Sequence, residues 1–222
     1  MKTILVTSQK GGSGKTMLTA HLAVEAERNG DAAWIIDTDR QATLTRWHER
    51  REAETPQRAD VRLERLAAGL TTLASQGGAY CFIDTAPTIS QQTALLIDLA
   101  DLIVIPVRPS PSDLWAVTET VQLVKEAGRP FLFVITQAKA QASITAQAIA
   151  ALSEHGRVAK SFIADRVGYA AAMTGGHTAP EITPKGPVAG EVADLWRELN
   201  AFFQQNKKAA TLQNNMKKVV NG

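Results

Sequence analysis

Lys10-Gly11-Gly12-Ser13-Gly14-Lys15-Thr16 is the stretch that decides the fold of this chain. It follows an apolar run at residues 3–6 and precedes a helix-like stretch at residues 17–28. A strand, a glycine-rich turn and a helix in this order form a phosphate cradle, because glycines let backbone N–H groups converge on phosphate oxygens and the helix N-terminus adds its positive dipole end. In this pattern Lys15 serves the β- and γ-phosphates, and the Thr16 hydroxyl serves Mg²⁺.

The loop departs from the general phosphate-loop pattern at its first residues. The general pattern has a glycine at position 9, where this chain has Gln9, and a second lysine, Lys10, stands five residues before Lys15. This departure narrows the function more than the motif itself does.

Apolar, β-branched runs alternate with helical patterns along the whole chain. Strands that read as unbroken apolar runs are buried on both faces, and their alternation with helices implies right-handed βαβ crossovers. The sequence therefore predicts an α/β fold with a doubly wound, mostly parallel sheet flanked by helices. The expected strands are residues 3–6, 33–36, 80–83, 102–107, 131–135 and 158–163, with a short edge strand after Asp60. The expected helices are residues 16–29, 42–54, 66–75, 91–99, 112–127, 144–155 and 188–203.

Composition predicts one domain followed by a basic tail. The chain has 222 residues and a formal net charge of +2, so the total charge identifies no nucleic-acid partner. We expect a single domain at residues 1–204 and a tail at residues 205–222, where lysines occur without any acid. Such a tail either touches polyanions or is simply solvated, and both readings stay open. The single cysteine, Cys81, forms no internal disulfide and suits a reducing cytoplasm.

Three carboxylates follow two of the apolar runs. Asp37 and Asp39 end the run that begins at residue 33, and Asp84 ends the run that begins at residue 80. A carboxylate at the end of a strand beside a phosphate loop is the Walker B arrangement, which holds Mg²⁺. If the strand continues, Asp37 and Asp39 point to opposite faces, so that one faces the metal and the other caps or positions. The alternative is that both form a turn.

These motifs resemble those of the ParA/MinD family of deviant Walker A ATPases. Residues 10–16 resemble the deviant Walker A motif, and Gln9 is common in front of it. Residues 35–44 resemble the second motif, although Arg40 and Ala42 replace the usual proline and glycine. Residues 82–87 resemble the Walker B motif, and residues 109–115 also look like a family segment. The similarity runs from residue 3 to residue 203.

The resemblance implies that ATP and Mg²⁺ are the cofactors and gives each residue a role. Lys15 would hold the β- and γ-phosphates, and Thr16 with Asp84 would serve the metal. Asp37 would support the Mg²⁺ shell, and Asp39 would position or activate the attacking water. The implied nucleotide contacts are Lys10, Gly11, Gly12, Ser13, Gly14, Lys15, Thr16, Met17, Thr136 and Gln137. At the last two positions relatives usually carry Asn and a polar or basic residue, so the preference for adenine follows from the family alone.

The oligomeric state that the resemblance implies depends on Lys10. In the family this lysine reaches across a dimer interface to the phosphates of the partner's ATP. A lysine ammonium supplied in trans suits the charge that develops on the γ-phosphate and ties hydrolysis to dimerisation. We therefore expect a weak ATPase that forms a homodimer when ATP is bound.

The first expected strand begins at residue 3. In this respect the chain resembles the short ParA subclass, which lacks an N-terminal helix-turn-helix. The resemblance implies a cytoplasmic, nucleoid-associated protein that binds DNA non-specifically and positions a plasmid, a chromosome region or a protein cargo. A ParB-like centromere-binding protein or a cargo adaptor would stimulate hydrolysis. The candidate DNA contacts are basic residues of the last third of the chain, since cations neutralise the phosphate backbone. They are Lys160, Arg166, Lys185 and Arg197.

Two alternatives stay open. A MinD-like ATPase would use the tail to lie on a membrane, because apolar residues fall at helical spacing beside lysines there, namely Leu212, Met216, Val219 and Val220. That apolar face is small and stable anchoring usually needs two signals, so we favour DNA over a membrane. The second alternative is a scaffold that binds ATP without useful turnover. A cluster-bridging reductase needs more cysteines than Cys81, and a tyrosine kinase of this fold needs a C-terminal tyrosine cluster that the chain lacks.

Overall fold

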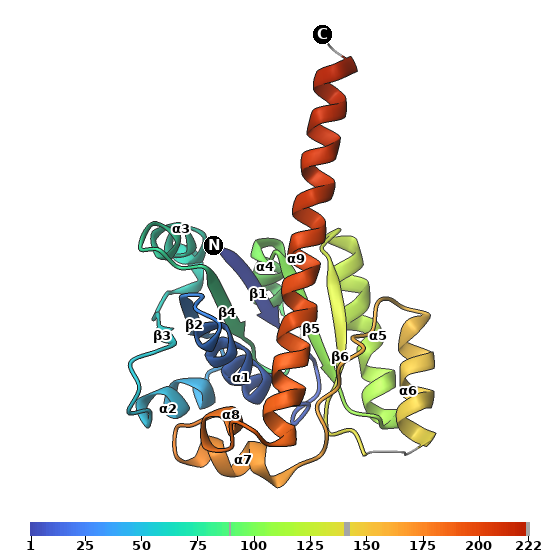
Figure 1. Cartoon of the computed structure of the whole chain (residues 1–222). Coiled ribbons are helices and arrows are strands. Elements are labelled where there is room, and N and C mark those ends of the chain that lie inside the picture. The colour runs from blue at the N-terminus through green and yellow to red at the C-terminus, as the bar shows by residue number, and fades with distance from the viewer. Residues whose placement is uncertain (89, 140–142, 221–222) are drawn as a thin grey trace.

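The protein is built around one six-stranded parallel sheet with helices on both faces (Figure 1). This computed structural model describes residues 1–88, 90–139 and 143–220, with residues 206–220 described by their backbone alone. The strand order is β3-β2-β4-β1-β5-β6, and every pairing is parallel. The strands are β1 (Lys2–Val6), β2 (Ala33–Asp37), β3 (Gln57–Arg58), β4 (Tyr80–Asp84), β5 (Leu102–Val107) and β6 (Phe131–Ile135).

The helices form two layers. On one face, helix α1 (Lys15–Arg28) and the first part of α9 (Pro187–Val220) pack on the sheet (Figure 1). The same layer contains α2 (Thr43–Glu49), α7 (Val167–Thr174) and α8 (Ala179–Ile182). The other face is covered by α3 (Leu66–Ser75), which follows the short 3-10 helix η1 (Leu63–Arg65), and by α4 (Gln91–Leu99), α5 (Pro111–Glu126) and α6 (Ser143–Ser153). The predicted doubly wound α/β fold is confirmed.

The unbroken apolar runs are buried on both faces, as predicted. All residues of β4 and β5 are buried. Along β1, Ile4 and Val6 join the cluster under α1 and α9, whereas Leu5 joins the cluster under α3 to α6. Because successive side chains of a strand point to opposite faces, one run of apolar residues serves both layers. The Cys81 thiol is buried in the sheet, and burial raises its pKa to about 12.

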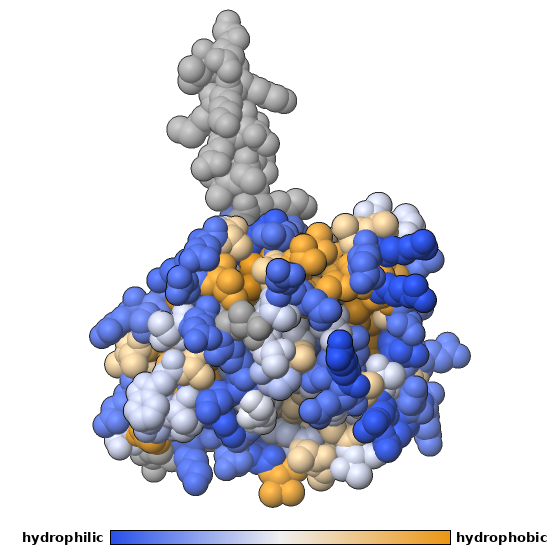
Figure 2. All heavy atoms as spheres, turned by 180° about the vertical axis from the view of Figure 1, so that it is seen from behind, coloured by the Kyte–Doolittle hydropathy of each residue, from blue (hydrophilic) through white to orange (hydrophobic). Residues whose placement is uncertain are grey.

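The outer face of the second layer is mixed in character. Figure 2 shows hydrophilic side chains over most of this side, with apolar side chains gathered toward its upper edge. Among the described residues, the exposed large apolar side chains on this layer are Leu95 of α4, Trp115 of α5, and Ile144 and Ile149 of α6. Each long helix therefore buries one side against the sheet and presents the other to solvent.

The expected strand at residues 158–163 is wrong. The segment makes two isolated parallel bridges, Phe133 with Val158 and Ala138 with Ala164. Between them, the backbone amides of Lys160 and Ser161 bind the Glu198 carboxylate of α9 instead of the sheet. On either side of these two residues, the Ala159 amide donates to the Phe133 carbonyl and the Ile163 amide to the Ile135 carbonyl, so the pairing with β6 is interrupted and a continuous strand does not form.

Three smaller expectations also differ from the structure. The short edge strand is β3, which precedes Asp60 rather than following it. Helix α2 ends at Glu49 instead of continuing to residue 54, because Arg51 folds back onto the Thr55 carbonyl. Helices α7 and α8 were not expected, since both are short.

Helix α9 runs through the boundary that the sequence analysis expects between residues 204 and 205. Its backbone continues as one helix to Val220 and extends beyond the body of the protein (Figure 1). Among the described residues, no helix is long and apolar enough to span a membrane.

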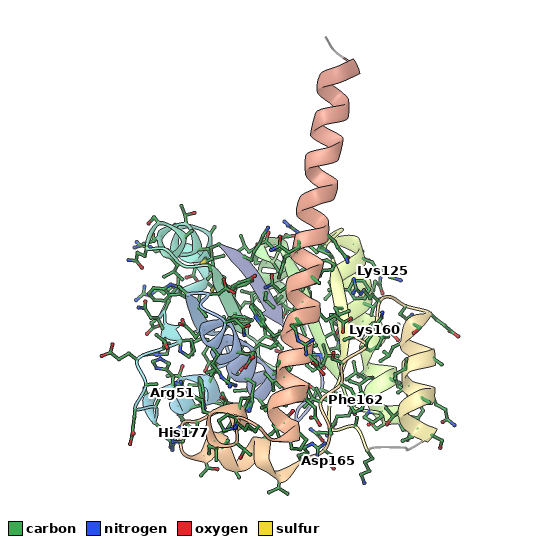
Figure 3. The ribbon with its side chains drawn as sticks, in the orientation of Figure 1. Arg51, Lys125, Lys160, Phe162, Asp165 and His177 are labelled. Atoms are coloured by element: carbon green, nitrogen blue, oxygen red, sulfur yellow. The ribbon has the colours of Figure 1, made fainter. Side chains whose placement is uncertain are left out.

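A network of polar contacts ties α2 to the α7–α8 turn. The Arg51 guanidinium is almost fully buried, makes a bidentate ion pair with Glu181, and donates to the Gly176 carbonyl. The Trp47 indole N–H donates to the His177 carbonyl over 3.0 Å. Figure 3 shows Arg51 and His177 at this junction. The α2 end and the turn therefore behave as one packed unit.

Gly176 packs directly against the backbone of Arg50 in this junction. Its replacement therefore tests how tightly the junction is packed. Gly176 has a φ of +76°, and an added Cβ would lie 2.5 Å from the carbonyl carbon and oxygen of Arg50. We expect Gly176→Ala to lower the free energy of unfolding by about 3 kcal/mol or more, combining backbone strain with overpacking. Urea denaturation followed by circular dichroism measures this change.

Gly30→Ala is the matched control for this substitution. Gly30 has a φ of +86°, but no atom lies within 4 Å of its added Cβ. It should therefore lower the free energy of unfolding by about 1 kcal/mol, from backbone strain alone. Equal losses in the two variants would show that the junction yields to accommodate a methyl group.

Candidate functional site

The phosphate loop joins β1 to α1 at the carboxyl edge of the sheet. Gly12 and Gly14 have φ values of +74° and +93°, a left-handed conformation that favours glycine. Gly14 is the N-cap of α1, and no side chain caps the helix there. The first amides of α1 thus remain available as donors, which is the property that makes a helix N-terminus bind anions.

The end of β6 fixes the position of the loop. The Thr136 hydroxyl donates to the Ser13 carbonyl and the Gln137 side-chain amide donates to the Gly12 carbonyl, each over 2.7 Å. Thr136 is fully buried, and Gln137 has a φ of +52° that turns the chain here. The two residues expected near the base therefore also hold two carbonyls of the loop.

Lys15 is buried within the loop that it would serve. Its ammonium donates to the Lys10 carbonyl over 3.1 Å, which holds the side chain back across the loop. Burial lowers the pKa of Lys15, although the carboxylates of Asp84 and Asp39 oppose this shift. A desolvated ammonium with few local partners attracts an anion strongly, because little bound water has to be displaced.

Thr16 and Asp84 meet beside Lys15. The Thr16 hydroxyl donates to Asp84 Oδ2 over 2.6 Å, and Asp84 Oδ1 is buried without a hydrogen-bond partner among the described residues. Burial raises the pKa of Asp84 to about 7, the hydrogen bond from Thr16 opposes the shift, and the neighbouring Asp37 adds to it. A hydroxyl beside an unpartnered buried carboxylate oxygen is a donor set that fits Mg²⁺.

Asp37 and Asp39 shape the segment between β2 and α2. Asp37 accepts from the backbone amides of Asp39 at 3.0 Å and Thr45 at 2.9 Å, so both of its oxygens support the start of α2. Asp39 Oδ1 accepts from the Gln41 amide at 2.9 Å. Asp37 is the register partner of Asp84 in the neighbouring strand β4, and its charge adds to the raised pKa of Asp84, while the Asp39 carboxylate opposes the lowering of the pKa of Lys15.

The first residues of the loop are anchored while the Lys10 side chain is not. The Gln9 side-chain amide donates to Glu119 of α5 over 2.6 Å. The Lys10 backbone amide lies 3.4 Å from the Ser8 hydroxyl. Within the residues that the structure describes, the Lys10 ammonium makes no ion pair within 4.0 Å.

A pocket of about 670 Å³ opens from the helix end of the phosphate loop. Met17 of α1 and Gln137 form the wall next to the loop, and α2 and α7 contribute the opposite wall. The segment at residues 163–166 also lines the pocket, and Figure 3 shows its Asp165 at the lower edge of the molecule, close to α7. Its lining is mostly apolar, as expected of a pocket for a flat ring.

Sequence reasoning missed most of this pocket. Trp47, Ile163, Asp165 and Tyr169 line it, and only the polar break after residue 163 marks any of these positions in the sequence. Arg166, which the sequence analysis assigns to DNA, also lines the pocket and forms an ion pair with Glu191 of α9 at 2.8 Å.

The structure does not bring the four basic candidates for DNA contact together. Lys160 and Arg197 line one shallow groove on the outer side of α9, where Arg197 pairs with Asp194. Lys185 lies in a separate hollow beside Gly190. Arg166 belongs to the pocket described above.

A second groove, of about 700 Å³, opens on the other side of Asp84. Asp37, Thr38 and Thr85 form its inner end, at the carboxyl ends of β2 and β4. The segment from Val61 to Glu64 and the start of α4 form its outer walls. In the described part of the chain, no three His, Cys, Asp or Glu residues lie together in a way that would hold a metal by themselves.

The fold and the site define a phosphate-loop nucleotide-binding protein. The family profile described as the CobQ/CobB/MinD/ParA nucleotide binding domain matches residues 4–148, which is more than half of the chain. The chain belongs to this family. The ParA/MinD resemblance that the motifs predicted is therefore confirmed.

Curated relatives match part of the chain. Maintenance of carboxysome distribution protein A from Halothiobacillus neapolitanus is 30% identical over 132 residues, which are 56% of this chain and 59% of the relative. Protein ParA from Rhizobium radiobacter is 27% identical over 129 residues, 57% of each chain. The chain thus spans somewhat more than half the length of the curated relatives it matches.

Solved structures extend the likeness of fold to nearly the whole chain. The cell division protein MinD of Aquifex aeolicus superposes with a TM-score of 0.75 at 18% identity and covers 90% of this chain and 98% of that one. An ATP complex of a Cyanothece McdA variant gives a TM-score of 0.68 at 20% identity, covering 88% and 94%. At these identities the comparison establishes the fold.

His21 of α1 supports the floor of the pocket and makes folding depend on pH. It is fully buried, its Nδ1 hydrogen bonds to the Met17 carbonyl, and its Nε2 accepts from the Ala179 amide. Burial lowers the pKa of His21 to about 4. Below pH 6.5 the unfolded chain binds a proton on this ring, while the folded chain does so only near pH 4. Stability from this group is therefore complete above pH 6.5 and lost as the pH falls toward 4.

We expect His21→Gln to remove this pH dependence. The loss from this group in the native chain amounts to about 3 kcal/mol between pH 7 and pH 4, so the stability advantage of the native chain over the variant should shrink by that amount. Urea titrations at a series of pH values measure it, with the exposed His155→Gln as control. An advantage that stays constant with pH would rule out a buried neutral His21.

Proposed function

We propose that this chain is a ParA-like ATPase that forms an ATP-sandwich dimer, binds DNA non-specifically and positions a plasmid, a chromosome region or a protein cargo. The observation that carries the proposal is the contact of Thr16 with Asp84 beside the buried Lys15. It combines a metal-binding donor set with a phosphate-binding cation in one glycine-rich loop. A partner of the ParB type, or a cargo adaptor, would stimulate hydrolysis.

The nucleotide would lie along the edge of the sheet. The amides of Gly11 to Gly14 and the start of α1 suit the phosphates, and Lys15 suits the β- and γ-phosphate oxygens. The pocket between Met17, Gln137 and α7 suits the base, because it opens directly from Gly14 and is largely apolar. Asp165 and Gln137 line this pocket, and the side-chain oxygens of both can accept from an exocyclic amine.

Mg²⁺ would be held by Thr16 and Asp84, with Asp37 in the surrounding shell. Held there, the ion would supply positive charge to neutralise the charge that develops on the phosphates during hydrolysis. Asp39 follows β2 by two residues and lies close enough to Lys15 to act on its pKa, which supports a role in orienting the attacking water.

Lys10 supports the dimeric part of the proposal. It begins the loop, its neighbour Gln9 is anchored to Glu119, and no carboxylate of the described chain pairs with its ammonium. A lysine held at the edge of the loop in this way can serve the phosphates of a second copy. ATP would then join the two copies and release them after hydrolysis.

The names of the relatives support a proposal for the cargo, and the basic residues support one for the surface that binds DNA. One is named for carboxysome distribution and another is a ParA protein, so the proposed output is spacing or partition. Lys160 and Arg197 are the candidate DNA contacts that share one surface, and Lys185 is a further one. Arg166 is a weaker candidate, because it pairs with Glu191 and lines the pocket beside the phosphate loop instead of this surface.

Lys15→Ala tests nucleotide binding. Removing the ammonium from the centre of the loop should weaken ATP binding by about a hundredfold or more, since charged hydrogen bonds to phosphate are lost. Calorimetric titration with ATP and Mg²⁺ measures the affinity. Lys125→Ala, on an exposed part of α5, is the control. If Lys15→Ala bound ATP as well as the control did, the loop would not be the nucleotide site.

Lys10→Ala tests the trans lysine. Each monomer should still bind ATP within about twofold of the native affinity, because Lys15 and Asp84 remain. ATP-dependent dimerisation and turnover should both be lost. Sedimentation analysis with a slowly hydrolysed ATP analogue, together with phosphate release, measures them. A variant that dimerises normally and keeps full turnover would show that Lys10 acts only within its own chain or not at all.

A further inference from the structure

Arg108 is a cation at the phosphate loop that the proposed mechanism does not yet use. It directly follows β5, the neighbour of β1 in the sheet, so it emerges at the same carboxyl edge as the loop. Its Nη1 lies 3.5 Å from the position that a Cβ on Gly12 would take. Gly12 is the loop glycine whose carbonyl is held by Gln137. The guanidinium therefore borders the loop at a point with no side chain between them.

Asp113 fixes the orientation of this guanidinium. Arg108 Nε donates to Asp113 Oδ1 over 2.9 Å, and Nη2 donates to Oδ2 over 3.0 Å. The carboxylate is almost fully buried, and Ser110 and Ser112 donate to it as well. Burial acts to raise the pKa of Asp113, but the hydrogen bonds from Arg108 and Ser110 outweigh it and leave the pKa lowered. The carboxylate is thus ionised and holds one edge of the fork.

The opposite edge of the fork faces the loop. Nη1 makes no hydrogen bond with any residue that the structure describes. Side-chain rotation cannot turn it away without breaking both bonds to Asp113. The ion pair also balances the Arg108 charge, which allows a third cation to stand beside Lys10 and Lys15. A directed donor remains, aimed at the glycine midway between the two lysines.

We infer that Arg108 is a positioning residue that donates from Nη1 to the terminal phosphate of the nucleotide in its own loop. This inference rests on the proposed ATPase function. The phosphate end of the loop is the relevant one, because the base pocket opens on the other side, at Gly14 and Met17. Lysine is a poor replacement for this residue, since its ammonium cannot form the bidentate pair with Asp113 that fixes the direction of the remaining donor.

A purely structural role for the pair is the competing explanation. Ser110 is the N-cap of α5 and Asp113 lies in its first turn, so the ion pair also stabilises the start of this helix. A structural role would affect ATP and ADP equally. A terminal-phosphate contact affects ATP alone, because ADP has no third phosphate.

Arg108→Gln separates the two explanations through the ratio of ATP to ADP affinity. We expect the affinity for a slowly hydrolysed ATP analogue to fall about tenfold and the affinity for ADP to stay within about twofold. Arg108→Lys should behave like Arg108→Gln. Arg28→Gln is the matched control, because Arg28 pairs with the buried carboxylate of Glu25 far from the loop. Equal losses for both nucleotides, or no loss for either, would overturn the inference.

Two further variants guard against misfolding and against a contact across the dimer. The double change Arg108→Gln with Asp113→Asn removes both charges, so it leaves no unpaired buried carboxylate, and it should show the same loss of ATP preference. In a Lys10→Ala background the preference should fall as much as in the native chain. If the effect vanished there, Arg108 would serve the partner's nucleotide, contrary to the inference.

These outcomes stay distinguishable from failure of the proposed function. If the native chain bound neither ATP nor ADP, the ATPase proposal itself would fail. If the native chain bound ATP through Lys15 and the Arg108 variants kept the native ATP-to-ADP ratio, only the role of Arg108 would be lost.

Discussion

The parallel sheet, buried on both faces, is the constraint on which the rest of the structure depends. Parallel strands can be joined only through crossovers, so all six strands end at one edge, and every loop that follows a strand begins there. The phosphate loop, Asp37, Asp84 and Arg108 are far apart in sequence, yet each stands at or directly after the end of a strand. Burial of the strands fixes their register, and the register brings these side chains together.

At that edge, two buried charged groups, Lys15 and Asp84, lack an ion-pair partner of opposite charge in the described structure. Lys15 is held by a carbonyl oxygen and Asp84 by a hydroxyl, and neither contact is an ion pair. Both groups have pKa values shifted toward their neutral forms by burial, which means that the charged forms are under-compensated. A polyphosphate with a divalent cation supplies both missing charges at once. This arrangement favours joint binding of the two over binding of either alone.

Local patterns in the sequence predicted the parts of the site that belong to single strands and turns. The glycines and Lys15 mark the loop, and Asp84 ends an apolar run. The loop and Asp84 can therefore be predicted from the sequence alone. Contacts between distant segments could not be predicted in this way. The Glu198 carboxylate accepts from the amides of residues 160 and 161, which is where the expected strand is interrupted. Arg166 looked free in the sequence because Glu191, its partner, lies 25 positions further along.

Glu191 links helix α9 to the wall of the pocket beside the phosphate loop. This one carboxylate accepts from the Ala164 amide, the Arg166 guanidinium and the Tyr169 hydroxyl, all of which belong to the wall of the pocket beside the phosphate loop. Among the described residues, none of those that line this pocket belongs to α9, and the Glu191 carboxylate connects the helix to the wall. A shift of α9 at Glu191 would therefore act on these three groups of the pocket wall together. The position of the pocket wall and the position of α9 are thus fixed by the same three hydrogen bonds.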